Sequence, residues 1–258
     1  MRLFIRDNMK LSLALTMLIF LNVGFSNPLI IGTAPDNPPF SSFSDNKNNF
    51  YGFEIDIMLE ICNRIHTPCQ FKPIILSNIL TLFTEQKLDL VIATVIAPPP
   101  NSPDAANFVF STPYLSSSAQ FLVRADSNIH TIQDIRYKTI GVRLGPLFKE
   151  TLFKDYVLKL YNQQLNVKSY LTMDDLMDGL QNQIVDAIFS NTRVLHYWFI
   201  ANTNQFRTVG EPFSMGNGYT IMGVKGEEAL IAQVNQALDS MQHDGTYIKL
   251  YTRYFTLE

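Results

Sequence analysis

The sequence predicts an α/β protein of two similar lobes, each a mostly parallel sheet flanked by helices. Apolar segments of strand length alternate with amphipathic segments of helix length, which is typical of α/β architecture. A unit of helix end, turn, aspartate and apolar strand occurs around Asp89 and again around Asp186, which indicates two related lobes. The length of 258 residues also fits, because about 230 residues beyond an N-terminal leader suit two lobes of about 110 each.

The first half of the chain is expected to hold three strands and two helices. Leu29–Thr33 and Leu88–Thr94 are apolar runs of the kind that a parallel sheet buries on both faces. The full series is strand Leu29–Thr33, helix Phe53–Ile65, strand Gln70–Ile74, helix Ile79–Gln86 and strand Leu88–Thr94.

The second half repeats the alternation. Its series is strand Thr139–Val142, helix Pro146–Tyr161, strand Val167–Tyr170, helix Met173–Gln181 and strand Val185–Phe189. Asp89 and Asp186 stand at the starts of corresponding strands, where we expect them to accept hydrogen bonds from local turn amides. A structural role is favoured over a catalytic one, because ligands in open α/β sheets bind at the carboxyl ends of strands.

Residues 1–26 have the pattern of a secretory signal peptide. Three basic residues lie within the first ten positions, and the apolar run from Leu11 to Phe25 is short for a membrane span. Small residues at 24 and 26 suit cleavage after Ser26, so the mature chain is expected to begin at Asn27. A retained membrane anchor is the alternative.

Charge and motif content narrow the function classes. Residues 27–258 carry a net charge of about −5, which argues against nucleic acid or an anionic membrane surface as partner. The four histidines are scattered without metal-ligand spacing, and His196–Phe199 is expected to pack as an ordinary helix segment. No nucleophile–base pairing or Gly-x-Ser-x-Gly motif occurs, so neither an enzyme nor a cofactor is expected.

Two cysteines in a secreted chain suggest an oxidising compartment and a disulfide. Cys62 and Cys69 are seven residues apart, and a continuous helix would hold them about 10 Å apart, too far to bond. Pro68 ends the helix and lets Cys69 turn back as the next strand begins. A Cys62–Cys69 bridge is therefore expected, with two buried free thiols as the alternative.

The order of several motifs resembles the bacterial periplasmic solute-binding proteins of family 3, the amino-acid type. An apolar strand precedes the turn Pro38-Pro39-Phe40 and the helix start Gly52-Phe53-Glu54-Ile55-Asp56. Phe110–Leu115 resembles the segment that leads into the first crossing between lobes, and Asp244-Gly245-Thr246-Tyr247 resembles the closing helix. The cysteine spacing is similar to that of the subset that binds lysine, arginine, ornithine or histidine. The resemblance covers essentially the whole mature chain.

The resemblance implies a two-lobe, Venus-flytrap fold with a two-strand hinge. Lobe 1 would comprise 27–115 and 213–258, and lobe 2 would comprise 116–212, with crossings near 116–122 and 209–213. We expect Asp244 to cap the closing helix and Gly245 to relieve the turn before it.

In the family the ligand lies between the lobes, at the carboxyl ends of strands from both. Relatives often have aromatic residues where Asn37 and Leu76 stand, and small hydroxyl residues near Thr94. The ligand-binding set that the resemblance implies is Ala34, Asp36, Asn37, Leu76, Ala93, Thr94, Arg143, Leu147 and Asn191.

The chain departs from the family pattern at both charge partners of a free amino acid. The family's carboxylate-binding arginine is missing, since no Arg or Lys occurs between Lys87 and Arg124; Asn101 or Asp104 stands near its place. The family's ammonium-binding aspartate falls on Asn191, which carries no charge. Ordinary amino acids should therefore bind weakly unless another group compensates.

Arg143 is the best candidate for that compensation. It ends a strand just before a helix, where it either enters the cleft or is a solvated strand-end residue. Arg193, two residues beyond Asn191, is expected on a helix surface.

The expected function is capture of a small polar solute by closure of two lobes, followed by delivery to the permease of an ABC importer. An amino acid or derivative is favoured, basic amino acids such as arginine first, and the protein is expected to be a periplasmic monomer. The alternatives are a ligand sensor or accessory subunit of a periplasmic enzyme and, third, a dehydratase-like enzyme on the same scaffold.

Overall fold

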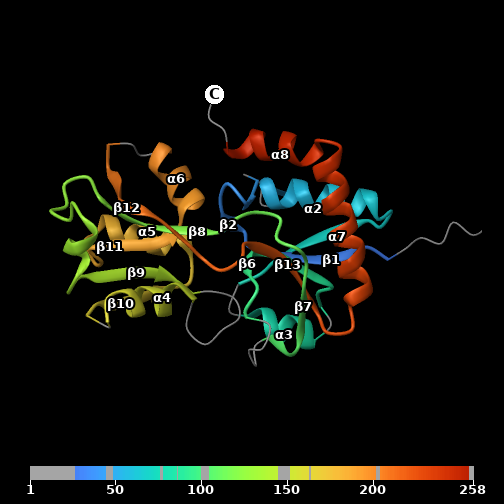
Figure 1. Cartoon of the computed structure of the whole chain (residues 1–258), viewed down its shortest axis with the longest axis horizontal. Coiled ribbons are helices and arrows are strands. Elements are labelled where there is room, and N and C mark those ends of the chain that lie inside the picture. The colour runs from blue at the N-terminus through green and yellow to red at the C-terminus, as the bar shows by residue number, and fades with distance from the viewer. Residues whose placement is uncertain are drawn as a thin grey trace, which may run out of the picture.

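The computed structural model describes residues 27–44, 49–75, 78–85, 87–99, 105–144, 152–162, 164–201 and 204–255. These residues form two five-stranded sheets, each flanked by helices, that lie side by side (Figure 1). The expected signal peptide at 1–26 lies outside the described residues. Among the residues that are described, no helix has the length and apolar character needed to cross a membrane.

The first sheet combines strands from both ends of the chain. Its order is β5 (Cys69–Pro73), β1 (Leu29–Thr33), β6 (Leu90–Ile96), β13 (Tyr219–Val224) and β7 (Phe108–Phe110). The first three are parallel, and β13 runs antiparallel to both its neighbours. Its helices are α2 (Phe53–Arg64), α3 (Ile79–Thr84), α7 (Glu228–His243) and α8 (Thr246–Phe255). Apolar residues of α2, α7 and α8 share one buried cluster, whereas α3 contributes to another.

The second sheet comes from the middle of the chain. Its order is β10 (Asn166–Tyr170), β9 (Thr139–Arg143), β11 (Ala187–Asn191), β8 (Ser118–Arg124) and β12 (Phe206–Ser214). Strands β10, β9 and β11 are parallel, and β8 is antiparallel to β11 and β12. Helix α4 (Leu152–Leu160) packs with Phe121 of β8, while α5 (Met173–Gln181) and α6 (Thr192–Ala201) pack with Leu122. Alternate residues of β8 therefore serve opposite faces.

A small third sheet lies at the turn after β1. It consists of β2 (Asp36–Asn37), β3 (Ser41–Phe43) and β4 (Phe50–Tyr51), paired antiparallel in that order. This hairpin holds Asp36 and Asn37 in place just beyond the carboxyl end of β1. The polar turn is thus fixed by backbone pairing, so its side chains can serve a site.

The predicted α/β alternation is confirmed, although some boundaries were wrong. Strand β6 runs two residues later than expected. Asp89, just before it, bonds to Ile30 of β1, and the strand's far end pairs with Tyr219 and Thr220 of β13. Thr94 therefore lies inside β6 rather than at its end. Strand β11 is likewise shifted, so that Asn191 is its last residue. The first part of the expected helix Pro146–Tyr161 falls outside the described residues; α4 covers Leu152–Leu160.

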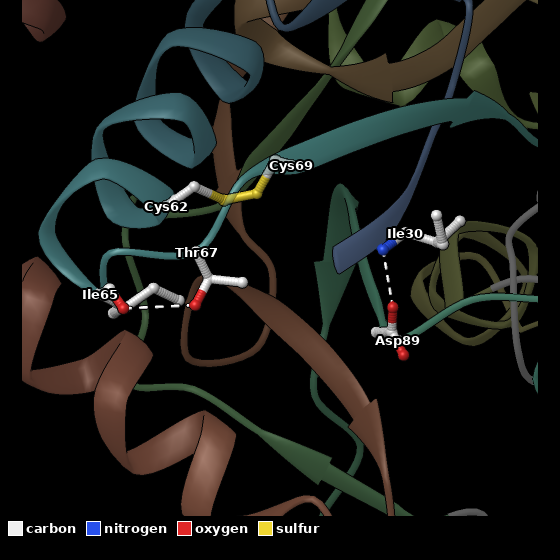
Figure 2. Close-up of a disulfide and its surroundings, with 6 residues drawn as sticks. All are labelled: Ile30, Cys62, Ile65, Thr67, Cys69 and Asp89. Atoms are coloured by element: carbon white, nitrogen blue, oxygen red, sulfur yellow. Dashed lines mark hydrogen bonds between the residues drawn. A yellow bond between two sulfur atoms is a disulfide. The ribbon is translucent and has the colours of Figure 1, made fainter. Parts of the chain in front are cut away.

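Asp89 and Asp186 have the expected structural role, but their partners are not local. Asp89 accepts a hydrogen bond from the backbone amide of Ile30 at 2.6 Å, and Asp186 accepts one from Thr139 at 2.8 Å (Figure 2 shows the first). Each carboxylate therefore joins a strand start to the neighbouring strand of its own sheet. The expectation of local turn amides was wrong, because the partner amides belong to Ile30 and Thr139, 59 and 47 residues away in the neighbouring strands.

The Cys62–Cys69 disulfide is confirmed (Figure 2). Helix α2 ends at Arg64, and the chain turns through His66, whose φ is +55°, before β5 begins at Cys69. The two Cα atoms are 6.1 Å apart, which is within the range of a disulfide. The bridge fixes the turn between α2 and the edge strand β5.

Reducing this disulfide will lower the free energy of unfolding by about 2 kcal/mol, the loop-entropy value for so short a loop. The measurement is chemical denaturation of the wild type with and without dithiothreitol. In a Cys62→Ala/Cys69→Ala variant the reductant should have no effect. An equal loss in wild type and variant would mean that the reductant acts elsewhere.

Gly52 is needed where β4 passes into α2. Its φ is +132°, and an added Cβ would meet backbone atoms of Phe40 and Ser41, the latter at 2.9 Å. Moving these backbone atoms aside would be costly, so the first position of the Gly-Phe-x-x-Asp motif requires glycine for a steric reason. Phe53 follows it into the core, where it is fully buried.

Substituting Gly52 with alanine will cost about 3 kcal/mol of unfolding free energy, from the unfavourable φ and the clash together. Gly226 provides a matched control, because its φ is +108° but no atom lies within 4 Å of an added Cβ. Gly226→Ala should cost only about 1 kcal/mol. Urea denaturation of both variants separates the cost of the positive φ from the cost of the clash. Equal losses of unfolding free energy in the two variants would contradict a clash at Gly52.

The segments expected as hinge crossings belong largely to β8 and β12. These strands pair along most of their length, with Ser118 opposite Ser214 at one end and Arg124 opposite Phe206 at the other. Leu115 forms a bridge with Tyr219 of the first sheet just before β8 begins. The passage between sheets thus occurs next to this bridge, and the exact lobe boundaries stay a prediction.

Candidate functional site

Polar residues of the small third sheet and of the second five-stranded sheet meet where Arg143 ends β9. Its Nη2 atom lies 2.6 Å from Oδ1 of Asp36, and its Nη1 atom donates to Oδ1 of Asn37 at 3.3 Å. The side chains of Arg143 and Asp36 are 12% and 23% exposed, so the ion pair is well shielded. Arg143 was expected either to enter the cleft or to be solvated, and in the structure its side chain points at the first lobe rather than into solvent.

The second carboxylate oxygen of Asp36 also contacts the second lobe. It accepts a hydrogen bond from the backbone amide of Met173 at 3.1 Å, at the first residue of α5. The start of a helix favours a negative charge. Next to this contact, partial burial and then the Asp36 carboxylate raise the pKa of Asp174. Asp36 therefore joins its own lobe to both a strand end and a helix start of the other.

On the first-lobe side, the contact continues into the core. Asn37 donates to Oγ1 of Thr94 at 3.4 Å, and the backbone amide of Thr94 donates to Oε1 of Glu54 at 2.6 Å. Thr94 has a φ of +51°, and the pairing of β6 with β13 shifts register in this region. Its amide is thus turned toward Glu54 at an irregularity in the strand.

Glu54 is a fully buried carboxyl group. Desolvation by burial raises its pKa to about 7, against the opposing effect of hydrogen bonds from the Tyr114 hydroxyl and the Thr94 amide. Its Oε2 atom is buried and has no partner among the described residues. Glu54 is not among the site residues expected from the sequence, although Ile57 and Met58 stand three and four positions later and both are buried. That spacing already indicates that Glu54 lies on the buried face of α2.

The side chain of Asn191 is buried, and its polar atoms already have hydrogen-bond partners within the protein. It is 6% exposed, and its side-chain oxygen accepts from the amides of Arg193 and Val194 at 2.8 and 3.4 Å, at the start of α6. Its Nδ2 atom donates to the hydroxyl of Tyr219 at 2.6 Å, which joins β11 to β13 of the other sheet. The residue in the family's ammonium-binding position thus serves here as a helix cap and an interlobe contact.

The remaining candidates divide into two groups. Ala34 and Ala93 are 1% exposed and lie in the apolar cluster around α3, so they can contribute only to the shape of a binding site. Leu76, Asn101, Asp104 and Leu147 lie outside the described residues. The structure therefore brings four of the expected residues together: Asp36, Asn37, Thr94 and Arg143.

This arrangement can bind a zwitterionic or cationic solute. A guanidinium has five N–H donors, and the Nε of Arg143 is buried without a partner among the described residues. Its N–H can donate to a carboxylate or carbonyl oxygen of a ligand, while the Asp36 carboxylate can bind a cation. Within the described ranges no three His, Cys, Asp or Glu residues gather as they would around a metal ion.

A comparison with known families identifies the family that has this fold. The model for bacterial extracellular solute-binding proteins, family 3, matches residues 29–257. The chain belongs to this family. The recognition made from the motifs is thereby confirmed, and the family comprises solute-binding proteins rather than enzymes.

Relatives agree over nearly their whole length. The arginine-binding periplasmic protein of Mannheimia haemolytica is 29% identical over 87% of this chain and 90% of its own. The L-cystine-binding protein of Escherichia coli (strain K12) is 28% identical over 88% and 82%. A solved structure, the periplasmic binding protein of an arginine transport system from Legionella pneumophila, is 35% identical over 89% and 100%, with a TM-score of 0.81. The two-lobe fold predicted from the sequence is confirmed.

Proposed function

We propose that this family 3 protein captures an amino acid or derivative in the periplasm, with basic amino acids such as arginine favoured, and delivers it to an ABC importer. The first 26 residues would be removed as a signal peptide, and the mature protein would act as a monomer. Relatives that are named for arginine, cystine and histidine support an amino-acid ligand. The proposal divides the chain into lobe 1 (27–115 and 213–258) and lobe 2 (116–212).

The observation that carries the proposal is the meeting of Arg143 with Asp36 and Asn37 across the two lobes. A ligand that exchanges these contacts for its own would touch both lobes at once. Closure is favoured only by contacts that exist in the closed form, so a site shared between lobes couples binding to closure. Arg143 would take the ligand carboxylate in place of the family's missing arginine, and Asp36 would take a cationic group.

Ligand-dependent thermal unfolding tests the proposal. The mature protein would be heated alone and with millimolar arginine, lysine, other amino acids, opines and polyamines. A ligand at about a hundred times its dissociation constant adds roughly 2.7 kcal/mol, which raises the midpoint clearly. Agmatine, which is arginine without its carboxylate, is the matched control for Arg143. If no compound shifts the midpoint of well-folded protein, the accessory-subunit alternative gains and capture of amino acids is contradicted.

A further inference from the structure

A pocket between the lobes lies apart from the site described above. It has a volume of about 670 Å³ and lies between α6 of the second lobe and α8 of the first. Figure 1 shows these two helices on the same side of the molecule. Ser116 and Ser118, at the passage between sheets, also line it, together with Thr208 of β12. None of Asp36, Asn37, Thr94 and Arg143 is among its lining residues.

One face of α6 forms the first wall. Arg193, His196, Tyr197 and Ile200 follow one another at intervals of three, one and three residues, so they share a helix face. Val194 and Leu195 are fully buried against the sheet, so this face looks outward into the pocket. Tyr197 and Ile200 are 43% and 41% exposed. Large apolar side chains this open at a concave site have surface left for a ligand to cover.

Aromatic residues of α8 form the opposite wall. Tyr251, Tyr254 and Phe255 repeat the same helical spacing and line the pocket. The hydroxyl of Tyr254 donates to Asp56 at 2.7 Å, and Arg253 pairs with the same carboxylate, so that charge is already compensated. The wall facing α6 is therefore aromatic and without a free negative charge.

Arg193 fixes a positive charge inside this pocket. It donates to the backbone oxygen of Ser116 at 3.0 Å, and its guanidinium lies 5.3 Å from the centre of the Phe255 ring. Arg193 lies on the outer face of α6, and the Phe255 ring and the Ser116 backbone hold its side chain at the pocket. The described residues that line the pocket include no Asp or Glu. The guanidinium thus faces the cavity without a carboxylate there.

We propose that this pocket binds a small carboxylic acid with an apolar body, such as an aryl-alkanoate. Arg193 would bind the carboxylate through its remaining donors, and the tyrosine and phenylalanine rings would cover the apolar part. The volume lies within the range of small-molecule sites. Because the occupant contacts both lobes, it biases their relative arrangement and is therefore coupled to solute binding in the other cleft.

Titration with 4-phenylbutanoate tests the proposal. Trp198, the single tryptophan of the chain, lies in α6 and reports on the pocket by its fluorescence. The acid should bind saturably below millimolar concentration, and the matched amide and amine should bind at least tenfold more weakly. No saturable binding at millimolar acid, or equal binding of acid and amide, overturns the proposal.

Two variants locate the binding. Arg193→Gln should weaken the acid at least tenfold and leave the amide unchanged, with folding checked by circular dichroism. Lys249→Gln removes an exposed positive charge from α8 outside the pocket and should change neither. The acid is titrated with no amino acid present, which keeps this result separate from the fate of the amino-acid proposal. Equal effects of Arg193→Gln and Lys249→Gln would reduce the interaction to general charge attraction and overturn the site.

Discussion

Replacing Arg143 with glutamine will weaken binding of the amino-acid ligand by about a hundredfold, because a shielded charge-assisted contact contributes about 2–3 kcal/mol. In the structure the guanidinium joins Asp36 and Asn37 to the end of β9, so its loss also removes a contact between the lobes. Calorimetric titration of both proteins with the ligand found by thermal unfolding gives the ratio directly.

Two controls make this result specific. Arg136→Gln removes an exposed arginine from the same lobe and should leave the affinity unchanged. If the ligand is arginine, agmatine should bind the wild type and Arg143→Gln about equally, because it has no carboxylate for Arg143 to hold. A loss that is the same for arginine and agmatine would show that Arg143 supports closure without touching the carboxylate. Unchanged arginine binding would remove Arg143 from the site altogether.

Glu54 predicts a pH dependence of stability with a definite sign. The pKa of an ordinary glutamate is 4.5, and in the folded protein burial raises that of Glu54 to about 7. The folded state therefore binds the proton more tightly than the unfolded state. The contribution of this group is fully present below pH 4.5 and is lost as the pH rises to about 7. Linkage places the total loss at about 3 kcal/mol.

Glu54→Gln should abolish that loss. The amide oxygen can still accept from Thr94 and Tyr114, but the side chain no longer ionises. As the pH rises from 4.5 to about 7.5, the unfolding free energy of the variant should increase by about 3 kcal/mol relative to that of the wild type. Urea denaturation of both proteins measures this difference. Because all other groups titrate equally in both proteins, the difference between the two unfolding free energies reports on Glu54 alone. A difference that does not change with pH would mean that Glu54 keeps an ordinary pKa when folded.

The sequence predicts the fold well where a local pattern determines it. The strand Leu29–Thr33 and the helix Met173–Gln181 were placed to the residue, because an apolar run marks the first and apolar periodicity the second. The disulfide followed from Pro68 and the seven-residue spacing. The boundary of β6 was missed, because its register depends on β13, which lies more than a hundred residues away.

The site was less predictable, because its contacts join segments far apart in the chain. Position and charge suggested Arg143, yet nothing local specifies that its partner is Asp36, 107 residues away. Asn191 was assigned from its place in the family pattern, whereas its amide is used by α6 and by Tyr219. The contact of Arg193 with Phe255 could not be predicted either, since that ring belongs to the C-terminal helix. Glu54 alone was recoverable from helical spacing.

The strand order of the first sheet has a consequence for how the protein matures. Strand β13 lies between β6 and β7, so these two strands have no shared neighbour until residue 219 and those after it arrive. The second sheet is contiguous from Ser118 to Ser214 and needs no later segment. A chain that emerges N-terminus first can therefore complete the second sheet before the first one. Meanwhile β6 would present an unpaired apolar edge where β13 later pairs, so newly made protein should depend on a holding chaperone until about the last forty residues have emerged.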